Sequence, residues 1–262
     1  MTRWVRFKSA DGRVGFGAIE RDHILEHAGD IYGEHAPSGK LLPLATVKLL
    51  SPCTPSKIVA LWNNFHALAA KLGKSAPRYP LFFIKPASCI IGPGEAIERP
   101  ITYKGKIVFE GELGIVIGKA CSNVSVLEAP LYIQGYTCVN DVTAIEVLTE
   151  DPDFPQWCRA KGYDTFGCIG PAVASELDWS TLRLVTKVDG AERQNYALAD
   201  MIFSPHELVS HVSHDMSLLP GDVIACGTSI GVGSIKEGAS VEISIEEIGV
   251  LTNSMARSSV RD

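Results

Sequence analysis

Apolar and polar residues alternate in short runs over the first fifty positions, and this period of two is typical of β-strands with one buried face. The runs cover residues 4–7, 14–19 and 23–25. Glycine, proline and serine are concentrated in residues 29–39, where we expect a loop, and Pro52 and Pro55 mark a linker. The pattern predicts a small N-terminal β domain over residues 1–50.

Further along the chain, most apolar runs are short and rich in β-branched residues, which also predicts strands. They cover residues 57–61, 81–84, 108–118, 136–141, 182–188, 223–226, 240–245 and 249–252. These strands outnumber the helices and do not alternate with them in regular βαβ units. We therefore predict an α+β fold with a mixed, curled sheet, formed as a main domain over residues 51–262.

The clearest helix is expected over residues 204–218, where apolar residues recur at helical spacing. Ser204 is the predicted N-cap, and Glu207 is its partner in a capping box. His211 and His214 lie away from the apolar face, so we interpret them as surface residues and not as metal ligands. A shorter helix is predicted over residues 63–73.

Two asparagines, Asn63 and Asn64, are the candidate caps of this shorter helix, and Gly73 is its predicted end. Residues 74–80 follow it and are polar and proline-containing. Segments of this kind often cover a site, and the helix with its loop is therefore a candidate lid.

Composition narrows the class of protein. Hydrophobic residues make up 46% of the chain and charged residues 21%, as in ordinary globular proteins. The net charge of −6 argues against nucleic acid or an anionic membrane as the partner. The N-terminus lacks a secretory apolar region, and no apolar run reaches the roughly 18 residues of a membrane span. Seven scattered cysteines without a C-x-x-C pair are typical of reduced thiols, so we predict a cytoplasmic protein.

Two carboxylates stand out within the strand predicted over residues 108–118. Glu110 and Glu112 are two residues apart and therefore point to one face, while Gly111 and Gly114 let a ligand or another chain approach. Two anions on one face of an apolar strand repel each other and are costly to bury. A solvated strand face is the ordinary explanation of such a pair, and a bound divalent cation is the alternative.

A third carboxylate favours the metal. Asp141 ends the strand predicted over residues 136–141. Carboxylates from two strands form a hard, all-oxygen site with positions left for water and substrate. Glu110, Glu112 and Asp141 therefore predict a site for Mg²⁺ or Mn²⁺.

Two further features gain meaning beside such a metal. Lys161, an ordinary surface lysine in most proteins, becomes a candidate partner for an oxyanion or a carboxylate. Residues 227–233 are rich in glycine but lack the Lys-Ser/Thr of a nucleotide-binding loop. They are either a tight connection between strands or a loop that offers Thr228 and backbone N–H groups to a carboxylate.

A metal with open coordination positions polarises a carbonyl and stabilises an enolate. A 2-oxo acid suits such a metal because its carboxylate and its ketone oxygen can both chelate. Three reactions then become accessible: C–C hydrolysis, decarboxylation and keto–enol tautomerisation.

Several motifs together resemble the fumarylacetoacetate hydrolase superfamily. In chain order they are Lys85-Pro86, Ile91-Gly-Pro-Gly94, Glu110-Gly-Glu112-Leu, Gly135-Tyr-Thr-Cys-Val-Asn-Asp141, Lys161-Gly-Tyr-Asp-Thr-Phe-Gly, Pro220-Gly-Asp222 and Gly227-Thr228. The match spans residues 57–252, and residues 1–50 resemble the small N-terminal domain of many members. The resemblance implies a catalytic β-roll, usually a homodimer. Its members hydrolyse acylpyruvates, decarboxylate oxaloacetate-like acids or isomerise hydroxymuconate-type diacids of aromatic catabolism.

The resemblance also implies roles for individual residues. It implies a site for Mg²⁺ or Mn²⁺ made of Glu110, Glu112 and Asp141. It implies a substrate-binding set made of Lys161, Thr228, Gln134 and Tyr136.

The predicted lid helix departs from the family pattern. Hydrolytic members carry Asn-Tyr-x-x-His-x-x-Glu there, and the histidine and glutamate activate water. Aligning Asn64-Phe65 with the Asn-Tyr pair puts Leu68 at the histidine position and Lys71 at the glutamate position. His66 lies two residues earlier than Leu68, and we assign it as the catalytic base.

The leading hypothesis is a metal-dependent hydrolase that cleaves a C–C bond in an acylpyruvate, a 2,4-dioxo acid, to release pyruvate and a carboxylic acid. In it, His66 delivers water and Lys161 helps to stabilise the departing enolate, while Glu146 and Glu150 are alternative bases. The runner-up is an oxaloacetate-type decarboxylase or a tautomerase, which needs no activated water. A third hypothesis is a protein that only binds a 2-oxo acid through its metal.

Overall fold

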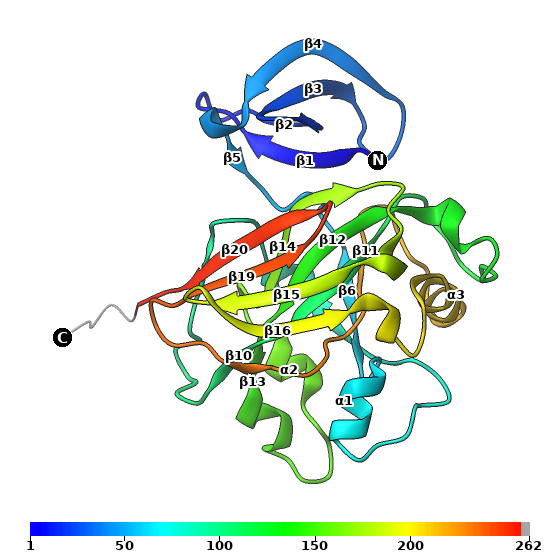
Figure 1. Ribbon diagram of the computed structural model, residues 1–262, viewed down its shortest axis with the longest axis vertical. Coiled ribbons are helices and arrows are strands. Elements are labelled where there is room, and N and C mark those ends of the chain that lie inside the picture. The colour runs from blue at the N-terminus through cyan, green and yellow to red at the C-terminus, as the bar shows by residue number, and fades with distance from the viewer. Residues whose placement is uncertain (258–262) are drawn as a thin grey trace.

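Strands dominate the computed structural model, which describes residues 1–257 (Figure 1). The largest sheet contains β1 (Arg3–Lys8), β2 (Val14–Glu20), β3 (His23–Gly29), β4 (His35–Pro43), β5 (Lys48–Leu49), β6 (Lys57–Trp62), β7 (Leu81–Pro86), β8 (Ile90–Ile91), β11 (Gly111–Ile117), β12 (Ile133–Asp141), β14 (Gly167–Ala174) and β17 (Val223–Ala225). A second sheet contains β10 (Ile107–Phe109), β13 (Thr143–Ala144) and β18 (Gly233–Ser234). A third contains β9 (Ala96–Ile97), β15 (Arg183–Val188), β16 (Ala191–Ala197), β19 (Ser240–Ile245) and β20 (Gly249–Met255).

The main path of the largest sheet runs β4-β3-β2-β1-β14-β12-β11-β17-β6-β7. Its pairs are mostly antiparallel, but β17 runs parallel to β6 and β14 runs parallel to β8. The predicted α+β class with mixed sheets is therefore confirmed. The last residues of the predicted main domain, 258–262, lie outside the described residues.

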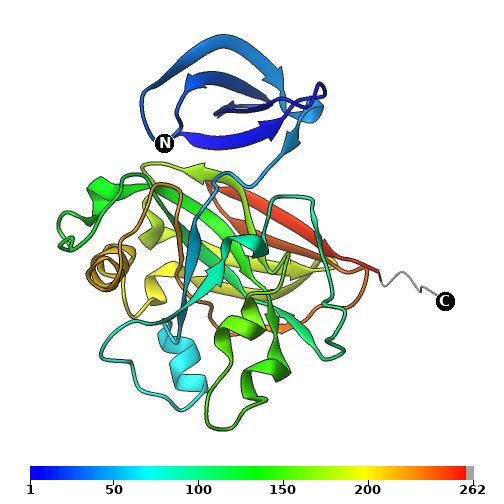
Figure 2. The same ribbon diagram turned by 180° about the vertical axis from the view of Figure 1, so that it is seen from behind.

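The strands β1 to β4 form a small curved unit that joins the rest of the largest sheet where β1 pairs with β14 (Figures 1 and 2). Phe7 and Ile24 pack against Ala172 of β14 at this junction. The loop predicted over residues 29–39 is wrong from His35 onward, because β4 begins there. β4 is an edge strand, and proline and glycine cost less in a strand with one unpaired side.

The strand β11 lies inside the largest sheet and is buried along its whole length. Ile115 packs in one apolar cluster, and its neighbour Val116, which points to the opposite face, packs in another. A strand buried on both faces has no solvated side for a carboxylate. The solvated strand face considered for the glutamates therefore does not apply to Glu112.

The α-helices of the described residues are α1 (His66–Lys71), α2 (Trp157–Lys161) and α3 (Pro205–Asp215), accompanied by short 3-10 turns. None of them is long and apolar enough to cross a membrane. The predicted capping box of α3 is confirmed: Ser204 accepts a hydrogen bond from the Glu207 N–H, and the Glu207 carboxylate accepts one from the Ser204 N–H. The helix ends at Asp215, earlier than the predicted Leu218.

The predicted cap of α1 is wrong. The helix begins at His66, and its N-cap residue, Phe65, makes no capping hydrogen bond; the carboxylate of Asp200 accepts one from the N–H of Ala67 in the first turn. Asn64 instead exchanges hydrogen bonds with the backbone of Phe203 and donates one to the carbonyl of Cys226, so it joins distant segments. Gly73 ends the helix as predicted, with a φ of 64°.

Asp222 is a buried charge in the turn before β17. Its carboxylate accepts hydrogen bonds from the N–H and the hydroxyl of Ser56, from the N–H and the ammonium of Lys57, and from the N–H of Leu219. Burial alone would raise the pKa of Asp222, but these hydrogen bonds, led by that of Lys57, hold it below its ordinary value.

We expect Asp222→Asn to lower the free energy of unfolding at pH 7 by about 2–3 kcal/mol, because the ammonium of Lys57 loses its partner. The pKa of Asp222 is lower in the folded protein than in the unfolded chain, so its stabilisation is present above about pH 3.9 and is lost as the pH falls through the folded value. Urea unfolding at pH 7 and pH 3 should show a difference that narrows at pH 3. The exposed Asp153→Asn is the control, and equal loss in both variants would contradict the prediction.

Candidate metal centre

The run predicted as one strand over residues 108–118 is interrupted at Glu110. β10 ends at Phe109 and pairs with β13 and β18, whereas β11 starts at Gly111 and pairs with β12 and β17. The prediction of one continuous strand is therefore wrong. Glu110 and Glu112 therefore lie at the junction between two sheets, and their side chains do not project from the face of one continuous strand.

The carboxylates of Glu110, Glu112 and Asp141 nevertheless converge. One ligand oxygen from each lies within 4.8 Å of the others. Glu112 and Asp141 are fully buried, and Glu110 is half-buried. The register of the sheet brings them together, because Gly111 pairs with Asn140, the residue before Asp141.

Among the three carboxylates, Glu112 has the fewest partners in the described part of the chain. Its Oε2 accepts a hydrogen bond of 2.8 Å from the N–H of Gly227, whereas its Oε1 has no hydrogen-bond partner in the described part of the chain. Burial raises the pKa of Glu112 well above its ordinary value, and the charges of Asp141 and Glu110 raise it further. Within residues 1–257 no ion pair holds this carboxylate, and the charge of Lys161 offsets only part of the rise in its pKa.

Two buried lysines face Asp141. Nζ of Lys85 lies 2.5 Å from Oδ1 of Asp141, and Nζ of Lys161 lies 2.6 Å from Oδ2. Lys161 also lies 3.0 Å from Oε1 of Glu110. Burial alone would raise the pKa of Asp141, but the charges of Lys161 and Lys85 outweigh it and lower that pKa.

Lys161 is held by the short helix α2, of which it is the last residue. Trp157, at the start of α2, stacks on Phe83 of β7 with ring centroids 5.3 Å apart. Nζ of Lys161 lies 5.2 Å from the centre of the Phe83 ring. Burial alone would lower the pKa of Lys161, but the charges of Asp141 and Glu110 raise it, so the amine stays protonated.

The residues of this cluster fit a hard divalent cation. Their donors are all carboxylate oxygens, which are the preferred ligands of Mg²⁺ and Mn²⁺. With all three carboxylates ionised, the two ammonium groups leave the cluster with one net negative charge. A cation among the three carboxylates would give the free oxygen of Glu112 a partner and would remove the repulsion that raises the pKa of Glu112.

The structure brings only part of the predicted substrate-binding set to the carboxylates. The hydroxyl of Thr228 donates a hydrogen bond of 2.9 Å to the carbonyl of Gly111, the residue between the two glutamates. Tyr136 and Gln134 lie toward the other end of β12, roughly 17 and 23 Å from Asp141 at about 3.3 Å per residue. The side chain of Tyr136 packs in the apolar core there.

The candidate bases are not held against the carboxylates by any described contact. His66 is exposed at the start of α1 and makes no hydrogen bond or ion pair with another described residue through its ring. Glu146 accepts a hydrogen bond from the hydroxyl of Tyr103, which lowers the pKa of Glu146. Glu150 pairs with Arg159 at 2.9 Å. Figures 1 and 2 place α1 and α2 at the end of the molecule away from the N-terminal strands.

Lys85 contacts Asp141 but was assigned no part in the site from the sequence, because it appeared there only within the family motif Lys85-Pro86. Phe83 and Lys85 share one face of β7, and both are buried. A lysine at an apolar position of a buried strand is costly to desolvate without an anion. That position was the available signal for an anionic partner such as Asp141.

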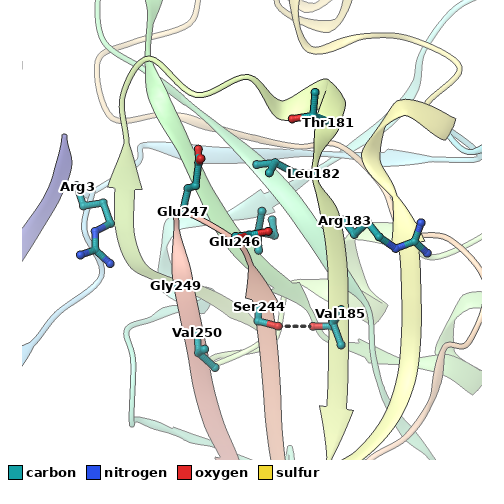
Figure 3. A pocket seen from close by; sticks show the side chains of 11 residues that line it. Arg3, Thr181, Leu182, Arg183, Val185, Ser244, Glu246, Glu247, Gly249 and Val250 are labelled. Atoms are coloured by element: carbon teal, nitrogen blue, oxygen red, sulfur yellow. Dashed lines mark hydrogen bonds between the residues drawn. The ribbon is translucent and has the colours of Figure 1, made fainter. Parts of the chain in front are cut away.

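A groove of about 490 Å³ lies elsewhere on the protein, beside Arg3 and the ends of β15 and β19 (Figure 3). It carries charges of both signs, from Arg183, Glu246 and Glu247 among others. The guanidinium of Arg183 donates hydrogen bonds to Asn195. The groove contains none of the three carboxylates and is separate from the candidate metal centre.

Two family models match the chain. The model described as fumarylacetoacetate (FAA) hydrolase, C-terminal, matches residues 57–256, and the model described as Rv2993c-like, N-terminal, matches residues 2–52. Protein Rv2993c of Mycobacterium tuberculosis is 40% identical over 257 residues, which cover 97% of this chain and 94% of that protein. These matches agree with the motifs found in the sequence.

Solved structures give the same result. The crystal structure of 2-hydroxyhepta-2,4-diene-1,7-dioate isomerase from Mycobacterium marinum is 39% identical with a TM-score of 0.90, covering 99% of this chain and 100% of its own. The crystal structure of maleylpyruvate hydrolase from Sphingobium sp. SYK-6 in complex with manganese (II) ion and pyruvate is 27% identical with a TM-score of 0.78, covering 97% of this chain and 98% of its own. One fold therefore carries an isomerase and a hydrolase among these relatives.

Proposed function

The chain belongs to the fumarylacetoacetate hydrolase family, and on that premise we propose that it is a divalent-metal-dependent enzyme acting on a 2-oxo acid. Glu110, Glu112 and Asp141 would hold Mg²⁺ or Mn²⁺. The observation that carries the proposal is the state of Glu112. It is fully buried, one of its oxygens has no partner among the described residues, and two other carboxylates lie beside it.

A bound Mg²⁺ or Mn²⁺ would supply Lewis-acid chemistry, which polarises the ketone of a 2-oxo acid and stabilises its enolate form. Lys161 would orient the substrate. Its ammonium carries three N–H donors, and contacts to Asp141 and Glu110 leave one for a substrate oxygen. Because the amine stays protonated, Lys161 would also stabilise negative charge that develops on that oxygen.

Two other residues have supporting parts in this proposal. Lys85 would act through Asp141, because its ammonium contacts only that one carboxylate and the carbonyl of Val142, whereas Lys161 contacts both Asp141 and Glu110. Thr228 would meet the substrate as a hydrogen-bond acceptor, because its hydroxyl proton is donated to the carbonyl of Gly111.

Among the reactions of the family, we favour isomerisation of a 2-oxo diacid through its enol form. This reaction moves a proton between carbon and oxygen and needs no activated water. Hydrolysis needs a base that is oriented by a third group, and the described contacts give His66 no such group. The 39% identity with the Mycobacterium marinum isomerase supports the same order.

Hydrolysis of an acylpyruvate is the second candidate. The related maleylpyruvate hydrolase structure contains manganese and pyruvate on the same fold. In this reaction His66 would deliver water to the distal carbonyl, and Lys161 would stabilise the leaving pyruvate enolate. Decarboxylation of an oxaloacetate-type acid would use the same binding site without a base for water.

Exchange of the C3 protons of a 2-oxo diacid with D₂O, followed by NMR, tests enolisation without requiring hydrolysis. We expect exchange to depend on Mg²⁺ or Mn²⁺ and to survive His66→Ala, with the exposed Lys71→Ala on the same helix as the matched control. Acylpyruvate cleavage that falls by about 10²-fold or more in His66→Ala but not in Lys71→Ala would make hydrolysis the activity instead. Tight oxalate binding without exchange or cleavage would leave a 2-oxo-acid-binding protein.

A further inference from the structure

The backbone N–H and carbonyl of Gly111, between the two glutamates, are held by side chains from β16 and from a loop. The N–H of Gly111 donates a hydrogen bond of 3.0 Å to Oε1 of Gln194 on β16. The carbonyl of Gly111 accepts hydrogen bonds from the hydroxyls of Tyr196, at 2.6 Å, and Thr228, at 2.9 Å. Both polar groups of Gly111 are therefore held by side chains outside its own strand.

Gln194 also contacts the loop of residues 227–231. Its Nε2 donates to Oγ1 of Thr228 at 2.8 Å, to the carbonyl of Ser229 at 3.3 Å and to the carbonyl of Ile230 at 3.4 Å. Its Oε1 accepts a second hydrogen bond, of 2.9 Å, from the hydroxyl of Thr186. Gln194 is almost fully buried, and one side-chain amide joins the glutamate pair to this loop.

The side chains that contact Gly111 lie beside an irregularity in the sheet. The register of β15 and β16 shifts between Thr186 and Lys187, which is the geometry of a β-bulge. A side chain at Gly111 would lie 2.3 Å from Oγ1 of Thr186, and one at Gly231 would lie 2.1 Å from the carbonyl of Arg193. Glycine at both positions lets the three segments approach closely.

The same loop touches the metal ligands at a second point, because the N–H of Gly227 donates to Oε2 of Glu112. The buried hydrogen bonds of Gln194 to Gly111, Thr186 and Thr228 stiffen this part of the protein, so a displacement at one end is felt at the other. Groups that contact metal ligands from outside commonly change metal affinity by about 10- to 100-fold when they are removed.

We propose that Gln194 is a positioning residue that couples the loop of residues 227–231 to Glu110 and Glu112. Movement of this loop around a bound 2-oxo acid then changes the geometry of the glutamate pair, and a bound cation in turn restrains the loop. The inference rests on the proposed metal site. It assigns a part in the function of that site to β16, which carries none of the three candidate metal ligands.

Gln194→Glu tests the hydrogen bonds from Gln194 to the loop separately from its hydrogen bond with Gly111. The substitution keeps acceptor oxygens for Gly111 and Thr186 but removes the amide donors to the loop, and even a protonated carboxyl supplies only one donor. Asn195→Asp, at the exposed neighbouring residue on β16, adds the same charge and is the matched control.

Hydrogen–deuterium exchange of residues 227–233 is measured with and without Mn²⁺, and oxalate affinity is measured on the Mn²⁺-loaded protein. We expect Mn²⁺ to slow exchange of the loop in the wild type and in Asn195→Asp, and to have little effect in Gln194→Glu. Oxalate affinity should fall by about 10-fold in Gln194→Glu and stay within about twofold in Asn195→Asp.

Tyr196→Phe keeps the ring, which packs on Phe65, and removes the hydroxyl with its hydrogen bond to Gly111. It should weaken Mn²⁺ binding by about 10-fold while the bonds from Gln194 to the loop remain. If Mn²⁺ slows loop exchange in Gln194→Glu as much as in the wild type, and oxalate affinity is unchanged, the coupling alone is overturned. Failure of the wild type to bind Mn²⁺ would overturn the proposed function together with the coupling.

Discussion

Glu112→Gln is expected to weaken Mn²⁺ binding by more than about 100-fold and, at the same time, to stabilise the metal-free protein. The loss of affinity follows because an amide oxygen replaces a charged ligand in a cluster of three carboxylates. The gain in stability follows because the fully buried Glu112 has an unpartnered oxygen and lies against two other anions. A neutral amide removes that repulsion and can donate a hydrogen bond to Glu110 or Asp141.

Mn²⁺ titration and urea unfolding in EDTA measure these two effects separately. We expect the metal-free variant to gain about 1–3 kcal/mol in the free energy of unfolding, the usual cost of an unsatisfied buried polar group. Glu98→Gln makes the same change at an exposed glutamate and should alter neither quantity. A variant that binds Mn²⁺ as the wild type does would remove Glu112 from the metal centre, and a destabilised metal-free variant would show that its charge is compensated.

Lys161→Met is expected to lower the rate of the enolisation reaction by about 10²–10³-fold while Mn²⁺ stays bound at least as tightly. The rate falls because the substrate oxygen loses a cationic donor that contacts Asp141 and Glu110 and is held at the end of α2. Metal binding does not fall, because the change removes a positive charge that repels the incoming cation.

Lys85→Met is the comparison that separates catalysis from folding. Lys85 is as deeply buried as Lys161 and contacts the same carboxylate, Asp141. It should act through that carboxylate, so its replacement should lower thermal stability and disturb Mn²⁺ affinity. Equal loss of rate and of stability in both variants would assign Lys161 a purely structural part. The expected result is a loss of stability in both variants, with a loss of rate in the Mn²⁺-saturated protein confined to Lys161→Met.

The strand pattern and the family motifs predicted the class of the fold because they depend on local residue order. Alternation along β1 and β2 and the apolar runs of β6, β7 and β19 each needed only neighbouring residues to be recognised. Residues 35–43 were missed because β4 is an edge strand whose prolines and glycine hide the pattern.

The three acidic residues of the candidate site were predictable from the sequence, but the lysines that pair with them were not all predictable. The two-residue spacing of Glu110 and Glu112 made them candidate ligands, and the position of Asp141 at a predicted strand end added the third. The spacing predicted one strand face, whereas the chain breaks between β10 and β11 at Glu110. Lys85 reaches Asp141 across 56 positions of the chain, a separation that no local pattern encodes.

The sequence by itself determined the features whose partners lie within a few residues, such as the capping box of α3, formed by Ser204 and Glu207. Only the tertiary structure decided where Asn64, Gln194 and Lys85 direct their polar groups. The physical reason is that desolvation and Coulomb attraction of buried groups are both large and nearly cancel, so the outcome depends on which distant segment supplies the partner.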